Sequence, residues 1–502
     1  MNNMVAIPTR PLEARLGAPA SAKLILFFEE PHLERERRQF SYFIKVDLAH
    51  TVMLAEQGIL RPEHARAILS TLLELEKLGA ENLPIDLKRG SLLFQIEQYL
   101  FSRIGEDIGG RMHTGRSRLD DGPTVRRLYK RNQLMEIFEA IINCRSVLLT
   151  LVDVHKATIM PGYTCLQHAH PGIFGHYLLS FANKLGDDFD RLAECYRRLN
   201  LNPLGGAGLS GTSWPIDRQR TAKLLGFSGC VNNSKLVREA YYAAELIGGL
   251  SFVMSTLNDL ATDLHIWSSY EFGLVEIADE FCGISSIFPQ KKNPTALEAI
   301  KFAAGEAVTW LASVLATFRA EGTGDVVMRE VPLLDKAFPA TLGSLNLTAA
   351  VIESIRVNRT RMLTLAPESW STATNLADEI VRLRDRSFRE AHSIVGRLVR
   401  IALTRGLTPA QINGSIVDEA ATEMGFEALA LDDVNISSAL DVESFAITRK
   451  SQGSTNPNEI NVLLEEERAS LLAARNWTDE RKLELTNSDR ELTKAINRWT
   501  AT

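Results

Sequence analysis

The sequence has few of the features that mark secreted, membrane-spanning or nucleic-acid-binding proteins. It has only five cysteines in 502 residues, and they are scattered, with no CxxC pair. This pattern excludes a disulfide framework and a zinc site, and it predicts reduced thiols in a cytoplasm. No apolar run is expected to reach the length of a bilayer span. The first twenty residues lack a basic start followed by an apolar core, so no secretory signal is predicted.

Positive charge is not in excess either. The chain has 56 Lys and Arg residues against 62 Asp and Glu residues, a formal net charge of −6. A surface that follows a phosphate backbone needs an excess of Lys and Arg, so a nucleic-acid partner is not expected. A chain of 502 residues is too long for one compact core, which predicts two or three domains.

What the sequence has in quantity is helical periodicity. In the segment 132–157, apolar residues such as Leu134, Ile137 and Phe138 recur at helical spacing. The segment 239–269 is apolar over more than one face, as in a helix that is buried in a bundle. Helices of about 25 residues are roughly 37 Å long. Since strand-like alternation is scarce, these segments predict an all-α fold with an elongated central bundle.

Breaks rich in Gly and Pro at 105–117 and 363–374 suggest the domain joints. We expect an N-terminal helical domain at 1–116, a central bundle of long helices at 117–368, a C-terminal helical domain at 369–460 and a charged helical tail at 461–502. The tail is predicted to form an appendage or to pack on a partner chain.

Four polar stretches interrupt the apolar helices, at 113–122, 161–172, 202–218 and 285–294. Helical bundles form ligand sites where such residues converge from different helices. The glycines at 205–208 follow no strand, so a dinucleotide site is not favoured. The histidines at 168, 170 and 176 have no suitably spaced carboxylate, so no metal site is predicted. The last stretch, "SSIFPQKKNP", is either a solvated turn or a loop that holds an anion.

Together these stretches resemble the argininosuccinate lyase family of the fumarase/aspartase superfamily. "MHTGRSR" is similar to its first catalytic region and "GYTCLQHAHP" to its second. "SSIFPQKKNP" is similar to its mobile catalytic loop, with Phe288 in the usual place of Met, and "STATNLADEIV" resembles its third domain. The resemblance implies an all-α, three-domain subunit and a homotetramer with a twenty-helix core. Each active site would draw on three chains and use no metal and no organic cofactor.

The resemblance implies reversible β-elimination of an N-substituted aspartate to fumarate and an amine. Loss of the weakly acidic proton creates a doubly charged aci-carboxylate, which needs fixed positive charge and N–H donors. The resemblance assigns this task to Lys291 and Asn293, and the role of general base to Ser285. A serine hydroxyl acts as a base only if nearby donors or cations favour its ionised form. Closure of the loop 283–294 would complete the site.

Other residues are expected to contact the substrate. Ser117, Arg118 and Thr164 match positions that hold the succinyl carboxylates, although Arg118 could be a plain ion-pair partner and Thr164 a helix cap. The remaining residues assigned to substrate binding on the same resemblance are Gln167, Ser286 and Lys336.

One departure affects acid–base chemistry. Cys165 stands where the family has a His, and a thiol does not replace an imidazole that is paired with a carboxylate. Glu298, at the position of that carboxylate, loses its usual partner. The elimination survives this change if serine is the base. Cys165 is then expected to be a buried, unreactive thiol.

Other departures gather on the amine side of the substrate. Asp47 and Leu119 replace a Ser and an Asn, and Met328 and Leu333 replace a Tyr and a Gln. Each buried group left without its hydrogen bond costs about 1–3 kcal/mol. We therefore expect a different N-substituted aspartate as substrate.

Asp47 is predicted to bind a cationic group of the leaving amine. The alternative is an ion pair with a protein cation such as Lys45 or Arg329.

Two alternatives remain open from the sequence. One is an orthodox argininosuccinate lyase that tolerates these changes, and the other is a catalytically silent, structural member of the family. The sequence does not determine the identity of the amine, nor whether the cell uses elimination or addition.

Overall fold

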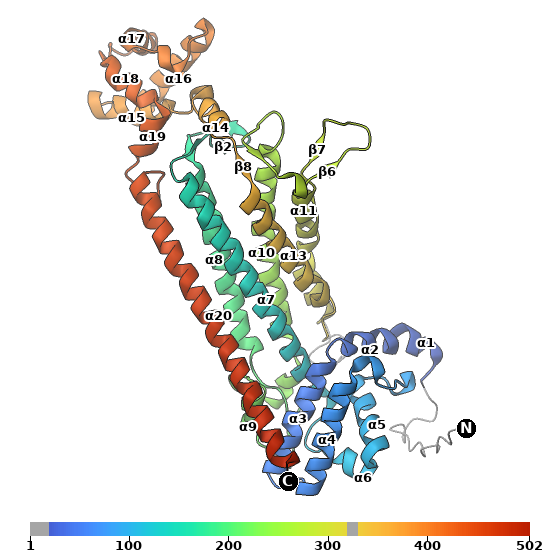
Figure 1. The fold of residues 1–502 in the computed structure, drawn as a ribbon. Coiled ribbons are helices and arrows are strands. Elements are labelled where there is room, and N and C mark those ends of the chain that lie inside the picture. The colour runs from blue at the N-terminus through green and yellow to red at the C-terminus, as the bar shows by residue number, and fades with distance from the viewer. Residues whose placement is uncertain (1–19, 319–329, 502) are drawn as a thin grey trace.

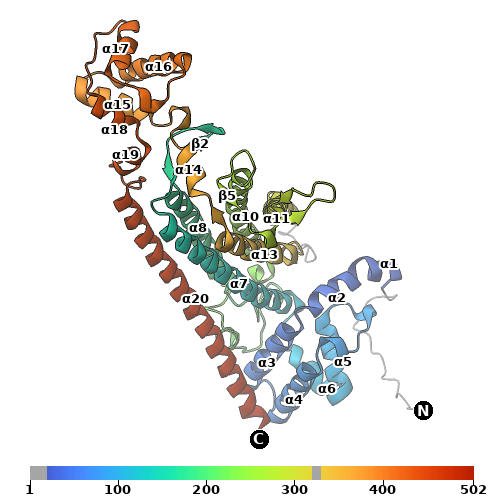
Figure 2. The same ribbon diagram turned by 45° about the horizontal axis from the view of Figure 1, so that its top comes forward.

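The computed structural model describes residues 20–318 and 330–501, and the fold is all-α as predicted (Figures 1 and 2). Long helices form an elongated central bundle, with one group of shorter helices at each end. The β-structure in the described ranges consists of four two-stranded ladders with two residues per strand and one isolated bridge between Asn202 and Cys230.

The first group of helices precedes the bundle. Its helices are α1 (Ala22–Leu24), α2 (Glu30–Arg37), α3 (Phe40–Glu56), α4 (Pro62–Leu78), α5 (Leu92–Ile104) and α6 (Glu106–Gly109). Helix α4 shows how the sequence sets its limits. It begins at Pro62, where a missing N–H breaks no intrahelical bond, and it stops at Gly79, which has a φ of +80°.

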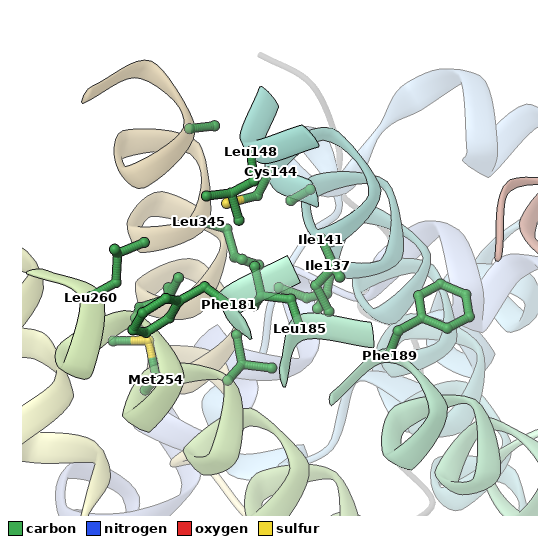
Figure 3. Close-up of a cluster of buried hydrophobic side chains, with 14 of the residues drawn as sticks. Ile137, Ile141, Cys144, Leu148, Phe181, Leu185, Phe189, Met254, Leu260 and Leu345 are labelled. Atoms are coloured by element: carbon green, nitrogen blue, oxygen red, sulfur yellow. The ribbon is translucent and has the colours of Figure 1, made fainter. Parts of the chain in front are cut away.

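The central bundle is built around long helices and includes shorter ones. They are α7 (Arg118–His155), α8 (Phe174–Leu199), α10 (Tyr241–Trp267), α11 (Thr295–Ala307), α12 (Trp310–Thr317) and α13 (Leu334–Ser354), with the short α9 (Arg218–Leu224) beside them. Figure 3 shows how their apolar faces meet: Ile137 and Ile141 of α7 lie close to Leu185 of α8 and Leu345 of α13. The helical periodicity of the sequence thus becomes a continuous apolar core.

The second group of shorter helices is C-terminal. Its helices are α14 (Arg359–Leu365), α15 (Ala373–Arg384), α16 (Phe388–Arg405), α17 (Gly414–Glu423), α18 (Asp433–Leu440) and α19 (Val442–Ile447). This group has a buried apolar cluster of its own. The cluster extends from Trp370 to Leu440. The cluster of the N-terminal group is less local in sequence, because it also includes residues between 204 and 227 and the end of the chain.

The C-terminal helix α20 (Pro457–Thr500) lies along its own chain, neither a free appendage nor an arm held only by a partner (Figure 1). Leu464 and Leu471 pack into the central cluster, and Leu492 and Ile496 pack into the N-terminal cluster. Glu467 of α20 pairs with the buried Arg145 of α7 at 3.0 Å. One helix therefore joins the central bundle to the N-terminal group.

The short ladders are confined to the loops that connect the helices. They pair β1 (Ile159–Met160) with β4 (Gly172–Ile173), β2 (Tyr163–Thr164) with β3 (Gln167–His168), β5 (Val275–Glu276) with β8 (Arg356–Val357), and β6 (Gly283–Ile284) with β7 (Lys292–Asn293). Two of these ladders carry residues that the sequence assigns to the active site.

One prediction about apolar segments is wrong. The stretch Thr295–Thr317, which contains α11 and α12, includes an 18-residue segment with a mean hydropathy of 1.3, long and apolar enough to cross a membrane by length and composition alone. Only 28% of this segment is buried, and Phe302 and Val308 are 73% and 81% exposed. An exposed apolar surface of this kind is typical of an interaction face.

Candidate active site

The predicted active-site residues lie in separate parts of one chain. Ser117 and Arg118 lie at the start of α7, near the N-terminal group of helices, and Thr164 lies in the hairpin that follows the other end of α7 (Figure 1). Helix α7 has 38 residues, which corresponds to about 57 Å. The two regions are too far apart to contact the same small molecule within one subunit.

The loop 285–291 is closed by a hairpin. Its strands β6 and β7 pair Gly283 with Asn293 and Ile284 with Lys292. Inside the loop, the backbone N–H groups of Ile287 and Phe288 donate hydrogen bonds to Ser285 Oγ at 3.3 and 3.0 Å. Hydrogen bonds from N–H donors favour an alkoxide over a hydroxyl. The loop thus supplies two of the donors that a serine base requires.

The two lysines of this loop have different environments. Lys292 Nζ lies 2.6 Å from Asp279 and 2.9 Å from Glu276. The hydrogen bond to Asp279, with that to Glu276 and the two negative charges, raises the pKa of Lys292, and burial opposes the shift. Lys291 is exposed and has no ion pair within the described ranges. Lys292 therefore fastens the hairpin to its own chain, and Lys291 is the ammonium group that remains available to an anion.

Thr164 and Gln167 face each other across a two-residue turn. The β2–β3 register pairs Thr164 with Gln167, so Cys165 and Leu166 form the turn. Both have positive φ angles, +55° and +58°, the conformation of the tight type I′ hairpin turn. Cys165 is exposed, so the expectation of a buried thiol is wrong for this chain. The reason is geometric, because the central residues of such a turn project away from the ladder.

Asp47 does not have a free carboxylate. It is fully buried on α3, and its Oδ1 lies 2.5 Å from Arg116 Nη1. Burial raises the pKa of Asp47, although Arg116 opposes the shift. The structure thus contradicts the predicted contact with a substrate cation and supports the ion-pair alternative. The partner is neither Lys45, which pairs with Asp489, nor Arg329, which lies outside the described residues.

The start of α7 is held by a capping network. Asp120 accepts a hydrogen bond from the N–H of Ser117 at 2.7 Å, and Ser117 Oγ accepts one from the N–H of Leu119 at 3.3 Å. Asp120 also accepts from the N–H groups of Gly205 and Ala207 at 2.6 and 3.0 Å. The glycine-rich stretch therefore binds a protein carboxylate, and it positions Ser117 and the half-buried Leu119.

Arg118 next to this cap is exposed and forms no ion pair with the part of the chain that the structure describes. This arrangement does not favour the simple ion-pair role that the sequence left open for Arg118.

Two further predicted residues, Leu333 and Lys336, lie at the start of α13. Lys336 pairs with Glu306 at 2.8 Å, and both side chains are partly exposed. Leu333 is half-buried against the central core. Ser286 is exposed beside Ser285. Met328 lies outside the described residues.

A cavity of about 140 Å³ opens beside Arg118. His32 and Glu36 of α2, Asp121 of α7 and Glu330 contribute to its wall. His32 places Nδ1 2.9 Å from Glu330 and Nε2 3.3 Å from Glu36. Burial alone lowers the pKa of His32, but the hydrogen bonds and charges of the two glutamates raise it to about 9. Both nitrogens of an imidazolium are donors, which suits a position between two carboxylates.

Comparisons with known proteins identify the family of this chain. A family model described as Lyase matches residues 29–309, and one described as Argininosuccinate lyase C-terminal matches residues 370–446. The argininosuccinate lyase of Methanothermobacter thermautotrophicus is 38% identical over 430 residues, which are 85% of this chain and 92% of the relative. This chain belongs to the argininosuccinate lyase family. A second relative, argininosuccinate lyase 1 of Shouchella clausii, is 35% identical and covers 89% of this chain and 91% of its own length.

Solved structures place this argininosuccinate lyase family member in the fumarase/aspartase superfamily. EDDS lyase in complex with formate superposes with a TM-score of 0.87 at 31% identity and covers 97% of both chains. An EDDS lyase variant with bound fumarate gives the same TM-score at 32% identity. The class II fumarase of Schistosoma mansoni, at 17% identity and a TM-score of 0.66, shares the fold. The protein is a carbon–nitrogen lyase that acts on an N-substituted aspartate.

Arg118 was predicted as a site residue, but the His and Glu residues that line the cavity with it were not. His32 and Glu36 are four residues apart on α2, a spacing that places two side chains together on one helix face, and this was a usable signal. Glu330 follows His32 by 298 residues, and no local pattern connects them. Arg116 and Asp121 lie within the polar stretch 113–122, but the sequence did not show that they share a buried site with Asp47.

Proposed function

We propose that this lyase eliminates fumarate from an N-substituted aspartate other than argininosuccinate, with Ser285 as the general base. The observation that carries the proposal is the pair of hydrogen bonds from Ile287 and Phe288 to Ser285 Oγ. In this mechanism Ser285 takes the proton from the carbon next to the carboxylate. The carbon–nitrogen bond then breaks, its electron pair leaves with the amine nitrogen, and a carbon–carbon double bond forms.

Charge on the reacting carboxylate must be stabilised before the amine leaves. Lys291 has the free ammonium group of the loop, and Asn293 lies where the hairpin closes. The carboxylates of the succinyl half would be held by Ser117, Arg118 and Thr164. These groups are hydrogen-bond donors, which suits dianionic fumarate as a product.

The amine half is proposed to differ from that of argininosuccinate. Leu119 and Leu333 are half-buried apolar side chains at positions where the family resemblance predicts polar ones. A buried polar group of the ligand that meets an apolar side chain loses about 1–3 kcal/mol for each missing hydrogen bond. The match to EDDS lyase over 97% of the chain also supports a lyase outside arginine synthesis.

We also propose a homotetramer in which three chains contribute to each active site. Two observations support it. The length of α7 separates Ser117 from Thr164 within one chain, and α11 and α12 have exposed apolar faces. Packing of several copies around these helices would bury the apolar faces and bring the separated groups together.

The test of the function is a substrate panel. The purified protein is mixed with fumarate and a series of amines, and adducts are identified by mass spectrometry, while argininosuccinate cleavage is followed by fumarate absorbance. We expect at least one adduct and a low kcat/KM for argininosuccinate. A value on the order of 10⁵ M⁻¹s⁻¹, typical of efficient enzymes, would show an orthodox argininosuccinate lyase. No reaction with any amine or with argininosuccinate would support the silent structural alternative.

A further inference from the structure

A second cavity, of about 350 Å³, lies between the hairpin segment 160–173 and the helices α8 and α10. Figure 1 shows strand β2 of this hairpin at the end of the bundle away from the N-terminal helices, and so away from Arg118. Sites for small molecules have volumes of about 300–1,000 Å³. Leu166 and Ser180 on the wall are exposed, so the cavity is open to solvent at its edge.

Four aromatic rings line this cavity. They belong to Tyr163 of β2, Tyr177 of α8, Trp267 at the end of α10 and Phe272 after it. The ring centroids of Tyr177 and Trp267 are 4.7 Å apart and those of Tyr163 and Phe272 are 5.4 Å apart, with interplanar angles of 58° and 64°. Three of the rings, all except that of Trp267, are only half-buried. Rings that are inclined to one another and partly open to a ligand suit a cation, because the ring faces carry negative charge.

One carboxylate, that of Asp263 on α10, also lines the cavity. Asp263 is half-buried, and it forms no ion pair within the described ranges. Tyr177 Oη donates a hydrogen bond of 2.8 Å to Asp263 Oδ2. Burial and the negative charge of Asp263 raise the pKa of Tyr177, so the phenol stays protonated and keeps its donor role. The aromatic wall therefore includes a negative charge.

Basic groups of the surrounding elements have other partners. Lys184 of α8 pairs with Asp259 of α10 at 3.0 Å. Arg361 donates a hydrogen bond of 3.2 Å to the carbonyl oxygen of Phe272 and is not on the cavity wall. His176 on the wall places Nε2 2.8 Å from a backbone carbonyl oxygen, a contact that the neutral ring makes with its proton on Nε2. In the described part of the chain, the carboxylate of the cavity is thus left to a ligand.

The wall also selects the kind of cation. A primary ammonium group has three N–H donors, and each donor that leaves water without finding an acceptor weakens binding. The cavity offers many ring and aliphatic carbons but a single carboxylate. An alkylated ammonium group keeps the positive charge and presents methyl groups instead of donors, which is the chemistry that aromatic cages recognise.

We propose that this cavity is a second ligand site of the enzyme, which binds a small organic cation with an alkylated ammonium group. Asp263 supplies the negative charge, and the four rings supply the apolar wall. Thr164 and Gln167, the hairpin residues assigned to the substrate, do not line the cavity. The second site is therefore separate from the groups that would hold the succinyl half, and it is independent of which amine leaves in the proposed reaction.

Calorimetric titration of the purified full-length protein tests the site with two ligands of the same shape. Choline and 3,3-dimethylbutan-1-ol differ in one atom, because choline has a quaternary nitrogen where the alcohol has a carbon. We expect choline to bind at least about tenfold more tightly than the alcohol. Equal affinity for the two ligands, or no binding of choline, would overturn the proposal.

Two variants of the cavity wall locate the binding. Asp263→Asn removes the charge and keeps an oxygen that accepts the hydrogen bond of Tyr177, so choline should bind at least about tenfold more weakly. Tyr163→Leu removes one ring and keeps an apolar side chain, so it should weaken choline more than the alcohol. Thermal unfolding checks the fold of both. Unchanged choline affinity in folded Asp263→Asn would overturn the site, and Tyr163→Leu decides in its place if that variant does not fold.

Asp259→Asn is the matched control. It also removes a carboxylate from α10, but Asp259 pairs with Lys184 and does not line the cavity. Choline affinity should stay within about twofold of the wild type. A loss as large as that in Asp263→Asn would show a general effect of charge and would overturn the site.

Competition with fumarate separates this cavity from the candidate active site. Saturating fumarate should leave the affinity for choline unchanged, because the two ligands would contact different residues. Displacement of choline by fumarate would place the cation in the active site and overturn the second site. Since the titrations need no turnover, failure of the proposed function would leave their outcome unaffected.

Discussion

The backbone N–H of Phe288 donates a hydrogen bond of 3.0 Å to the hydroxyl oxygen of Ser285, and Ile287 adds a second one at 3.3 Å. Both donors belong to the loop that the β6–β7 hairpin closes. Backbone donors that are fixed before reaction stabilise a developing oxyanion without reorganisation. The loop thus combines a hydroxyl group with the donors that would stabilise its ionised form.

Ser285→Ala should abolish turnover and leave the fold and the oligomeric state intact. The substitution removes the proton acceptor of the proposed mechanism and only one oxygen from a partly exposed loop. Fumarate absorbance measures the rate, and circular dichroism and light scattering check the structure. Ser286→Ala is the neighbouring control, which should retain a measurable kcat. A Ser285→Ala enzyme within a few-fold of the wild-type rate would refute the assignment of the base.

If each active site is shared between chains, two inactive variants should complement each other in mixed oligomers. Ser285→Ala and Arg118→Ala should each be inactive as homo-oligomers, because every site then lacks one group. Co-expression of the two variants should restore part of the activity, since some mixed sites take an intact loop from one chain and an intact Arg118 from another. Mixed oligomers that are confirmed by mass spectrometry and yet inactive would contradict shared sites.

Cys165→Ser should keep a measurable turnover. Cys165 lies exposed in a two-residue turn with a φ of +55°, and the proposed mechanism moves no proton through it. Cys165→Gly should also be stabilising, because a non-glycine residue in a left-handed conformation costs roughly 1–2 kcal/mol. Thermal unfolding and kcat measured on both variants test this. Loss of turnover in Cys165→Ser with unchanged structure would make the thiol a catalytic group.

The contact of His32 with Glu330 predicts a dependence of stability on pH. The folded pKa of His32 is about 9, against an ordinary value of 6.5, so the folded state holds a proton that the unfolded state loses. The resulting stabilisation is complete below pH 6.5, decreases as the pH rises towards 9 and is absent above it. It amounts to at most about 3 kcal/mol.

Urea unfolding of the wild type and His32→Gln at pH 6.5 and 9 measures this effect. The wild type should lose more stability than the variant over this interval. His392→Gln, on the exposed side of α16, is the control and should behave like the wild type. Identical pH profiles for wild type and His32→Gln would show that the pair contributes nothing to stability.

Much of the fold, and the chemical groups of the candidate site, could be predicted from the sequence. The period of apolar residues in 132–157 predicted α7, because helix formation and burial of one face depend on residues three and four apart. The stretch 285–294 contained its hydroxyl, its free ammonium and its amide within ten consecutive positions. Features encoded by neighbouring residues can be recognised without a structure.

The tertiary structure decided which groups meet. Asp47 pairs with Arg116, 69 residues away, and His32 pairs with Glu330 across 298 residues. These partners were not predictable, because the free energy of a buried charge depends on whichever charges the fold places around it. The exposure of Cys165 depends on the register of strands β2 and β3. The position of α20 depends on apolar contacts at both of its ends. The sequence by itself determined the helices and the chemical groups of this lyase, whereas long-range packing determined their partners.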